Sequence, residues 1–397
     1  MTLELPPSAD AVVIGAGIVG AAVSACLAAT GRSVCVIDRS GPLGGTTAAG
    51  EGNILVSDKL PGPELALALR SLALWRDFAT TAGVEFETKG GVVVAHNAGQ
   101  LAALSAQAGG QRAAGVEATE LDQPSLRAAE PHIAPDLPGG AFYPQDCQVQ
   151  PMLAAMAYLA RSGNSGVVRA EAVGLDPGAG RLITGQGRIA TPIVVNAAGP
   201  WSGEVARRLG SDLPVRPRRG HILVTEPLPP VIRHKVYECD YVGAVASDSG
   251  ALACSAVVES TASGTVLIGS SRDYGGALPG LSGSPGHGST APGGPPPEAR
   301  VLAEIARRAV SLFPVLRQVR AIRAYTGYRP ACADHLPVIG PDPSIPGLYH
   351  ATGHEGAGIC LAPATAELLT ALIDAAPTTV DPAPFSPARF CGGHHAR

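Results

Sequence analysis

The chain has 397 residues, of which 46% are hydrophobic and 16% are charged, and its formal net charge is −4. This length exceeds one compact core and predicts two domains, while the slight acidic excess argues against nucleic acid or an anionic membrane as a partner. No apolar run reaches the roughly 18 residues of a transmembrane segment, and the first ten residues lack the features of a signal peptide, so the expected location is the cytoplasm.

The first forty residues carry the most informative pattern. A short run rich in β-branched residues, Ala11–Ile14, ends in a GxGxxG from Gly15 to Gly20. An Ala-rich helical segment follows to Ala29, and a second strand-like run, residues 33–37, ends at Asp38. Strand, glycine turn, helix, strand and acid in this order predict a dinucleotide-binding unit, with a glycine-rich turn of an ordinary α/β domain as the alternative.

Each residue type in this unit has a physical reason. Gly15 permits the tight turn, Gly17 lets the backbone approach a pyrophosphate, and Gly20 lets helix and strand pack closely. The helix N-terminus offers N–H groups and a positive dipole end to the phosphates. Asp38, eighteen residues after Gly20, is placed to bond a ribose hydroxyl, which argues against NADP but leaves FAD and NAD open.

The middle of the chain alternates between helical and strand-like patterns. Residues 41–53 are small and flexible, as a surface loop would be or as a backbone needs to run flush against a planar cofactor. Residues 275–297 are dense in Gly, Pro and Ser and predict a mobile loop. The other predicted elements are helices at 64–82, from Pro151 onward and at 298–312, and strands at 92–94, 167–168, 175, 182–183, 193–195, 221–225 and 265–269.

The far end of the chain repeats the opening pattern. A strand at 348–352 leads into a glycine-rich turn at 353–358 and an apolar helix to about residue 373. If this unit closes onto the first one, the nucleotide-binding domain is discontinuous, and the helix N-terminus faces the cofactor ring. The alternative is an ordinary C-terminal βα unit. The eight cysteines form no CxxC pair, so no metal site is predicted.

Five segments together resemble the D-amino-acid-oxidase-like family of FAD-dependent amine oxidoreductases. They are VVIGAGIVG with Asp38-Arg39, GTTAAGEGN, VVNAAGPW, RRGHILVTEP, and the series GYRP…DHLPVIG…GLYHATGHEGAGICLAP. The family includes glycine oxidase, D-amino acid dehydrogenase, sarcosine oxidase, and the β-subunits of hydrogen cyanide synthase, opine oxidase and hydroxyproline dehydrogenases. The resemblance runs nearly the full length, and its C-terminal series favours FAD over NAD.

The resemblance implies an α/β and α+β architecture. A discontinuous Rossmann-like FAD-binding domain, formed by residues 1–85, 146–215 and 326–397, receives an inserted substrate domain with a mixed or antiparallel sheet, formed by residues 86–145 and 216–325. It also implies which residues meet the cofactor. These are Gly15, Ala16, Gly17, Ile18, Val19 and Gly20 at the pyrophosphate; Asp38, Arg39 and Ala172 at the adenosine; Gly45, Thr46, Thr47, Glu51, Gly52 and Asn53 along the ribityl chain and ring; Ala198, Gly199 and Trp201; and Gly353, His354, Glu355, Gly356, Ala357, Gly358 and Ile359 at the pyrimidine.

For the substrate, the resemblance implies that Arg329 pairs with a carboxylate, since a guanidinium matches a carboxylate bidentately. The alternative is a structural ion pair between Arg329 and Asp334. Tyr241 and Tyr328 are weaker candidates for lining the substrate site. His354 is expected to bond the flavin or pack on it rather than act as a base.

The implied activity is oxidation of the C–N bond of a small amino acid or secondary amine, by hydride transfer to flavin N5. Relatives with covalent flavin carry a cysteine near the position of Gly327, so the FAD is expected to be non-covalent. Some oxidases of the family place a lysine over the flavin, and this chain has none after Lys235. The GTTAAGEGN loop and residues 262–272 also look closest to the β-subunits of multi-subunit dehydrogenases. We therefore expect a dehydrogenase, and the resemblance implies a hetero-oligomer as one arrangement of it. The alternatives are an oxygen-using oxidase of the glycine oxidase type, an NAD-dependent dehydrogenase, and a non-catalytic FAD-binding electron-transfer subunit.

Overall fold

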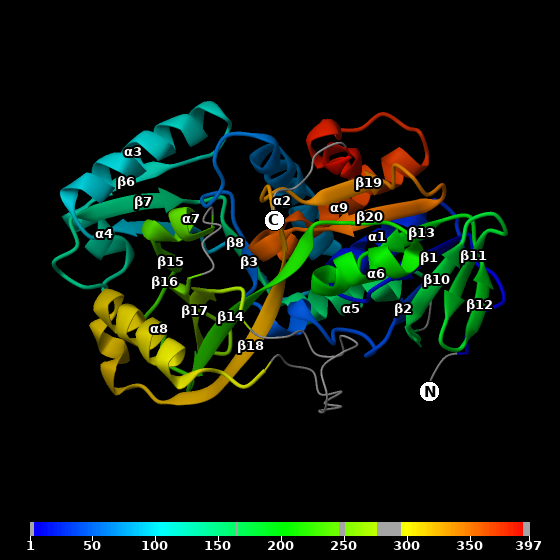
Figure 1. The fold of residues 1–397 in the computed structure, drawn as a ribbon. Helices are drawn as coiled ribbons and strands as arrows, with labels where there is room; N and C mark the ends of the chain where they lie inside the picture. The colour runs from blue at the N-terminus through cyan, green and yellow to red at the C-terminus, as the bar shows by residue number, and fades with distance from the viewer. Residues whose placement is uncertain (1–3, 164–165, 246–250, 276–294, 392–397) are drawn as a thin grey trace.

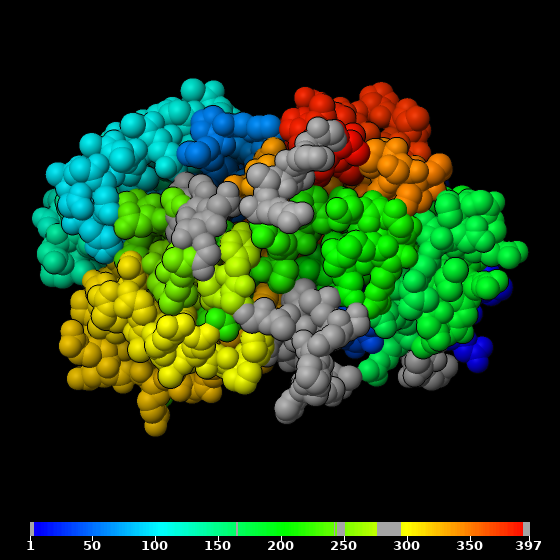
Figure 2. Space-filling view, viewed as in Figure 1, coloured from blue at the N-terminus to red at the C-terminus, as the bar shows by residue number. Residues whose placement is uncertain are grey.

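The computed structural model describes residues 4–163, 166–245, 251–275 and 295–391. Two lobes are visible, one around a six-stranded sheet and one around an eight-stranded sheet (Figure 1). In the space-filling view their surfaces, cyan and yellow on one side and green, orange and red on the other, pack closely against each other (Figure 2). The expected loop at 275–297 lies almost wholly outside the described residues.

The six-stranded sheet joins the two ends of the chain. Strand β13 pairs in parallel with β1 on one side and with β20 on the other, so that Val194 faces both Val12 and Leu348. The prediction that the C-terminal unit closes onto the first one is therefore confirmed. The strand order is β19 (Val338–Pro341), β20 (Leu348–Thr352), β13 (Val194–Asn196), β1 (Ala11–Ile14), β2 (Val34–Asp38) and β9 (Val168–Arg169), with only the β19–β20 pair antiparallel.

Alternate residues of β1 reach two different cores, as the two-residue period of a strand requires. Ala11 and Val13 pack with helices α1 (Ile18–Ala29) and α9 (Gly358–Ile373). Val12 and Ile14 pack on the other face, against the three-stranded sheet β10 (Ala172–Asp176), β11 (Arg181–Thr184) and β12 (Gly187–Ala190). Helices α2 (Pro63–Ala82) and α5 (Pro151–Arg161) complete the helical layer. All four helices confirm the sequence predictions.

Among the described residues, one helical stretch, Glu355–Ile373, is long and apolar enough to cross a membrane, although no such run was expected. It contains α9, which contacts α1 and α2, and 61% of its apolar window is buried inside the protein. Its apolarity is therefore explained by its place in the core.

The eight-stranded sheet carries the second lobe. Helix α8 (Ala299–Leu312) contacts β16 and β17, while α3 (Ala98–Ala113) and α4 (Gln123–Ala129) contact β6 and β7. The expected domain boundary at residue 326 falls inside β18. The strand order is β18 (Ala321–Cys332), β14 (Val215–Thr225), β17 (Val266–Arg272), β16 (Ala253–Ser260), β15 (Lys235–Glu238), β5 (Gly91–Ala95), β7 (Gly139–Tyr143) and β6 (Thr119–Asp122).

Three further features complete the fold: a short sheet, a long strand pair and two short helices. The short sheet of β3 (Asn53–Ile54), β8 (Cys147–Val149) and β4 (Phe86–Glu87) anchors the end of the loop at 41–53. The long strands β14 and β18 pair along eleven residues of each and run between the lobes (Figure 1). Helices α6 (Ser202–Leu209) and α7 (Asp240–Val245) each follow a strand. The structure thus brings the glycine turn, the 41–53 loop and the β14–β18 pair to one place.

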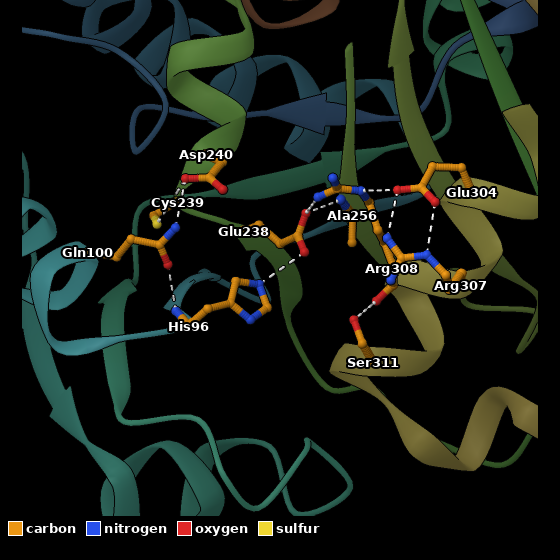
Figure 3. A network of polar contacts seen from close by, with 10 residues as sticks. All are labelled: His96, Gln100, Glu238, Cys239, Asp240, Ala256, Glu304, Arg307, Arg308 and Ser311. Atoms are coloured by element: carbon orange, nitrogen blue, oxygen red, sulfur yellow. Dashed lines mark hydrogen bonds and ion pairs between the residues drawn. The ribbon is translucent and has the colours of Figure 1, made fainter. Parts of the chain in front are cut away.

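A buried carboxylate ties the second lobe together (Figure 3). Glu238 of β15 accepts hydrogen bonds from His96 Nε2 at 3.0 Å, from Arg308 Nη1 at 3.2 Å and from the amide of Ala256 at 2.6 Å. Its side chain is only 3% exposed. The hydrogen bond to Glu238 raises the pKa of His96. One carboxylate therefore links α8, β16 and the segment before α3.

We expect Glu238→Gln to lower the free energy of unfolding by about 3 kcal/mol, because it removes the charge of a buried carboxyl that His96, Arg308 and the amide of Ala256 share. Urea unfolding measures the change. Glu120→Gln is the matched control, since Glu120 pairs with Arg112 on the surface and an exposed pair contributes about 0–1 kcal/mol. Equal losses in the two variants would contradict the assignment of the effect to burial.

Candidate active site

A pocket lies between the glycine turn after β1, the 41–53 loop and the β14–β18 pair, and the space within its bounds, open solvent included, is about 1580 Å³. Its walls come from both lobes, because residues of β14 and β18 face residues that follow β1, β13 and β20. The site is therefore made only by the assembled fold.

The glycine turn leaves no room for side chains. Gly15 has φ +111°, and a Cβ added there would lie 2.4 Å from the carbonyl oxygen of Ala197. A Cβ on Gly20 would lie 2.0 Å from the carbonyl oxygen of Gly15. The first glycine thus sets the turn and the third sets the helix–strand packing, as the motif predicts.

Two amides of this turn are bonded within the protein. The amide of Ala16 donates to Asp38 Oδ2 at 2.9 Å, and the amide of Ile18 donates to Thr47 Oγ1 at 2.9 Å. Asp38 also accepts the amide of Ser40 at 2.8 Å, and burial raises its pKa. Asp38 therefore holds the turn as well as lining the pocket where a ribose would lie.

The end of the pocket beyond Asp38 is shaped by stacked and paired side chains. The guanidinium of Arg39 lies 4.5 Å from the ring centroid of Trp201. Arg208, which the sequence analysis did not select, bonds Glu204 at 2.6 Å and also bonds Glu171. Ala172 lines this same end. Aromatic and charged side chains therefore gather at this end of the pocket, beside the position expected for an adenosine moiety.

The loop at 41–53 passes directly under β18. Thr46 donates its hydroxyl to the carbonyl oxygen of Tyr328. A Cβ added to Gly327 would lie 2.8 Å from Cβ of Ala49. The backbones therefore touch here, which leaves no space for the cysteine that relatives with covalent flavin carry near this position.

The substrate candidate Arg329 points into the pocket from β18. Its Nη1 donates to the carbonyl oxygen of Ser271 at 2.9 Å, and a Cβ on Gly220 would lie 2.5 Å from the same nitrogen. Burial and then the nearby Arg272 lower the pKa of Arg329. The alternative ion pair with Asp334 is wrong, because Asp334 bonds Arg389 Nε at 2.6 Å instead. The guanidinium of Arg329 is thus positioned by backbone groups and faces the pocket.

A second charged group stands beside Arg329. Glu355 lines the pocket at φ +48°, and its Oε1 lies 3.4 Å from Arg218 Nη1 and 3.5 Å from Arg272 Nε. Burial would raise the pKa of Glu355, but Arg272, Arg329 and Arg218 outweigh it and hold that pKa below its usual value. Sequence reasoning assigned no site role to Arg218 or Arg272, because strand pairing brings them to the turn after β20.

His354 and the two tyrosines are also placed. The imidazole of His354 bonds Thr365 of α9 at 2.9 Å, and burial lowers its pKa to about 3, so it is no base at neutral pH. Tyr241 and Tyr328 both line the pocket, and the guanidinium of Arg272 lies 4.5 Å from the ring centroid of Tyr241. The structure therefore turns the His354 side chain away toward the helix.

Most of the predicted residues line one pocket. Their roles stay predictions, and five of them, Ala16, Gly20, Gly52, Gly353 and Ala357, lie behind the lining. Those that line it are Gly15, Gly17, Ile18, Val19, Asp38, Arg39, Gly45, Thr46, Thr47, Glu51, Asn53, Ala172, Ala198, Gly199, Trp201, Tyr241, Tyr328, Arg329, His354, Glu355, Gly356, Gly358 and Ile359. The lining residues that sequence reasoning missed include Ser40, Gly44, Glu171, Glu204, Arg208, Gly220, Ile222 and Thr352.

The residues present fit FAD. A close-approach turn at a helix N-terminus, an acid at the end of β2 and the ring of Trp201 suit the adenosine diphosphate half. The small residues of the 41–53 loop line the pocket opposite β18 and let the backbone lie along a planar ring. None of the described residues that line this pocket is a cysteine, and burial raises the pKa of both Cys332 and Cys360 to about 12.

We expect acid precipitation of the holoprotein to release all FAD into the supernatant, because thioether formation needs an accessible thiolate. Absorption of the pellet and the supernatant measures the split. Flavin colour retained by the washed, denatured pellet would contradict this prediction.

A family model described as FAD dependent oxidoreductase (DAO) matches residues 10–372. Glycine oxidase from Geobacillus kaustophilus is 27% identical over 401 residues, which cover 96% of this chain and 97% of that protein. Glycine oxidase from Pseudomonas putida is 30% identical over 206 residues, and hydrogen cyanide synthase subunit HcnC from Pseudomonas aeruginosa is 29% identical over 289 residues. These two matches cover 51% and 68% of this chain, and span 47% and 59% of the relatives' lengths.

The fold has solved counterparts. The crystal structure of glycine oxidase from Geobacillus kaustophilus superposes with a TM-score of 0.84 at 24% identity, covering 98% of this chain and all of that one. L-proline dehydrogenase from P. horikoshii gives a TM-score of 0.83 at 23% identity, covering 97% and 98%. The two-lobed architecture described above is therefore the architecture of these enzymes.

Proposed function

Because the chain belongs to the DAO family of FAD-dependent oxidoreductases, we propose that it oxidises the C–N bond of a small amino acid or secondary amine. The substrate class comprises glycine, D-amino acids, hydroxyproline and opines. The observation that carries the proposal is the guanidinium of Arg329, which faces the same pocket as the dinucleotide-binding turn. A carboxylate bound there would hold the neighbouring C–H and C–N bonds at the ring end of the cofactor site.

When bound, FAD supplies the acceptor for the hydride of the α-carbon, and the imine product then hydrolyses or leaves. The protein supplies binding and orientation. Arg329 offers two parallel N–H donors to the carboxylate, and the carbonyl oxygen of Ser271 fixes the guanidinium plane. Tyr241, which is 6% exposed, closes the substrate end against water, whereas the side chain of Tyr328 lies on the other face of β18, near Arg219 and Asp273.

Anaerobic mixing of the holoprotein with each candidate amine tests the proposal. We expect at least one of glycine, D-amino acids, hydroxyproline or opines to bleach the visible absorption of the flavin, with the imine or its hydrolysis products formed in equal amount. A holoprotein that no amine reduces would instead be the electron-transfer subunit considered above.

The proposal includes a dehydrogenase rather than an oxidase. Some oxidases of the family place a lysine over the flavin, and Lys235 is the last lysine of this chain. Its side chain is buried and bonds Glu259, and the described residues that line the pocket include no lysine. The likeness to a subunit of hydrogen cyanide synthase supports a partner subunit that takes the electrons. A comparison of peroxide yield with dye reduction distinguishes a dehydrogenase from an oxidase, and a near-stoichiometric peroxide yield favours an oxidase of the glycine oxidase type.

Location in the cytoplasm stays a prediction.

A further inference from the structure

Glu51 is a buried carboxylate with an unused oxygen. It lies between the 3₁₀ turn Thr46–Ala49 and β3, and is 8% exposed. Its Oε2 accepts a hydrogen bond from Asn53 Nδ2 at 3.1 Å, whereas its Oε1 is buried and has no hydrogen-bond partner among the described residues. A buried acceptor left without a donor costs about 1–3 kcal/mol, so this oxygen is matched to a donor that the protein itself does not provide.

Glu51 lines the pocket, and its Oε1 is enclosed between β17 and the pocket lining. A Cβ added to Gly269 would lie 2.6 Å from Oε1 and 3.3 Å from the side chain of Ile222, and both Ile222 and Glu51 line the pocket. Arg329 lines the same pocket and interacts electrostatically with Glu51, whose pKa burial raises. A carboxyl and a guanidinium therefore belong to the lining of one pocket, which is a pattern complementary to an amino-acid zwitterion.

We propose that Glu51 binds the amine of the substrate through Oε1 and accepts its proton, while Arg329 holds the carboxylate. This inference rests on the proposed function and assigns that site a proton acceptor. In the step, one N–H bond of the substrate ammonium breaks and one O–H bond forms on Glu51. The electron pair stays on nitrogen, and the neutral amine can then lose hydride from its α-carbon; the proton transfer itself needs no oxidant.

The surroundings of Glu51 suit a proton acceptor. Burial raises its pKa, Lys235 lowers it, Glu259 raises it and Arg329 lowers it, with the net direction upward. A raised carboxyl pKa brings the acceptor nearer to the pKa of an amine. The charged and titratable groups that face Glu51 are Lys235 of β15, Glu259 of β16, Arg272 of β17, and Tyr325 and Arg329 of β18.

Glu355, the other acidic side chain at this end of the pocket, is not equivalent. Its Oε1 already lies within 3.4 and 3.5 Å of two guanidinium nitrogens, and its Oε2 accepts the amide of Gly356. Its pKa is held low by Arg272, Arg329 and Arg218 despite its burial. Glu355 is thus a weak base that is bonded within the protein, whereas Glu51 has both a free oxygen and a raised affinity for a proton.

The test is the pH dependence of anaerobic flavin reduction in the Glu51→Gln holoprotein, with the best amino-acid substrate. With its base, the wild type accepts the ammonium form, so reduction rises only with the ionisation of Glu51 and then levels off. The variant can use only the neutral amine. We expect the rate of flavin reduction in Glu51→Gln to be about 100-fold lower than in the wild type at neutral pH. This difference shrinks by roughly tenfold per pH unit as the pH approaches the pKa of the free amine.

Binding provides a second readout that needs no turnover. Acetate, which has a carboxylate and no amine, is expected to perturb the flavin spectrum of Glu51→Gln at the same or a lower concentration than in the wild type. Glu355→Gln is the matched control, and we expect it to weaken acetate binding through Arg329 while it keeps the pH profile of the wild type.

Each outcome decides. A Glu51→Gln variant with wild-type reduction, or with the same loss at every pH, overturns the role of Glu51. Weaker acetate binding in Glu51→Gln also overturns it, because the residue would then act through Arg329 or the fold. Failure of the proposed function is distinct, since then no amine reduces the wild type.

Discussion

Replacement of Arg329 by lysine is expected to lower kcat/KM for amino-acid substrates by about 100-fold, mostly through KM. The ammonium of lysine keeps the charge but loses the two parallel donors, and hydrogen bonds to a charged group contribute about 1.5–3 kcal/mol. Loss of the bond to the carbonyl oxygen of Ser271 also frees the side chain to move. Steady-state kinetics with saturating dye acceptor measures the change.

Arg389→Lys is the control for this variant. Arg389 bonds Asp334, the residue considered above as a partner for Arg329, and lies away from the pocket lining. We expect its kcat/KM to stay within twofold of the wild type. An unchanged KM in Arg329→Lys would remove Arg329 from the substrate site and leave the pocket without its carboxylate-binding group.

Replacement of Gly15 by alanine is expected to abolish FAD retention. The residue combines φ +111° with a backbone contact that a Cβ would approach at 2.4 Å, so the turn must move away from Ala197. A left-handed conformation costs a non-glycine residue about 1–3 kcal/mol, and the displacement adds to this cost. The flavin-to-protein ratio after gel filtration and the thermal unfolding midpoint measure the effect.

Gly31→Ala separates the two contributions. Gly31 has φ +88°, but no described atom lies within 4 Å of an added Cβ. The alanine in this variant is therefore destabilising only through the left-handed backbone conformation, without a steric clash. We expect it to bind FAD fully and to unfold at a slightly lower temperature. If Gly15→Ala retains as much flavin as Gly31→Ala, the close approach at the turn has no part in cofactor binding.

The local patterns of the sequence were sufficient to predict most helices and strands. The strand at Ala11–Ile14, the helix Ile18–Ala29 and the helix Ala299–Leu312 lie where periodicity and glycine or proline signals predict them. Such signals depend only on residues within one helical turn or one strand, so they can be recognised in the sequence without knowledge of the tertiary structure. The strand expected at 221–225 is only half of β14, because its first residues are held by pairing with β18 rather than by their own propensity.

The charges of the site could not be predicted in the same way. Asp334 is near Arg329 in sequence but pairs with Arg389, since β18 ends and the chain turns between them. Lys235 and Glu259 are brought to Glu51 by strand pairing and burial, and the loop at 41–53 showed only that its backbone was small enough to lie along a ring. Their charge states depend on desolvation, which exists only after folding.

The sequence by itself determined the glycine turn and the acid at Asp38, because each is carried by residue types at fixed spacing. It also determined the family resemblance, which implied the candidate Arg329. Only the tertiary structure decided which carboxylate keeps a free oxygen, which arginines surround Glu355 and where the His354 side chain points. The physical reason is that hydrogen-bond partners and solvent exposure are properties of surfaces brought together by the pairing of β13 with β20 and of β14 with β18.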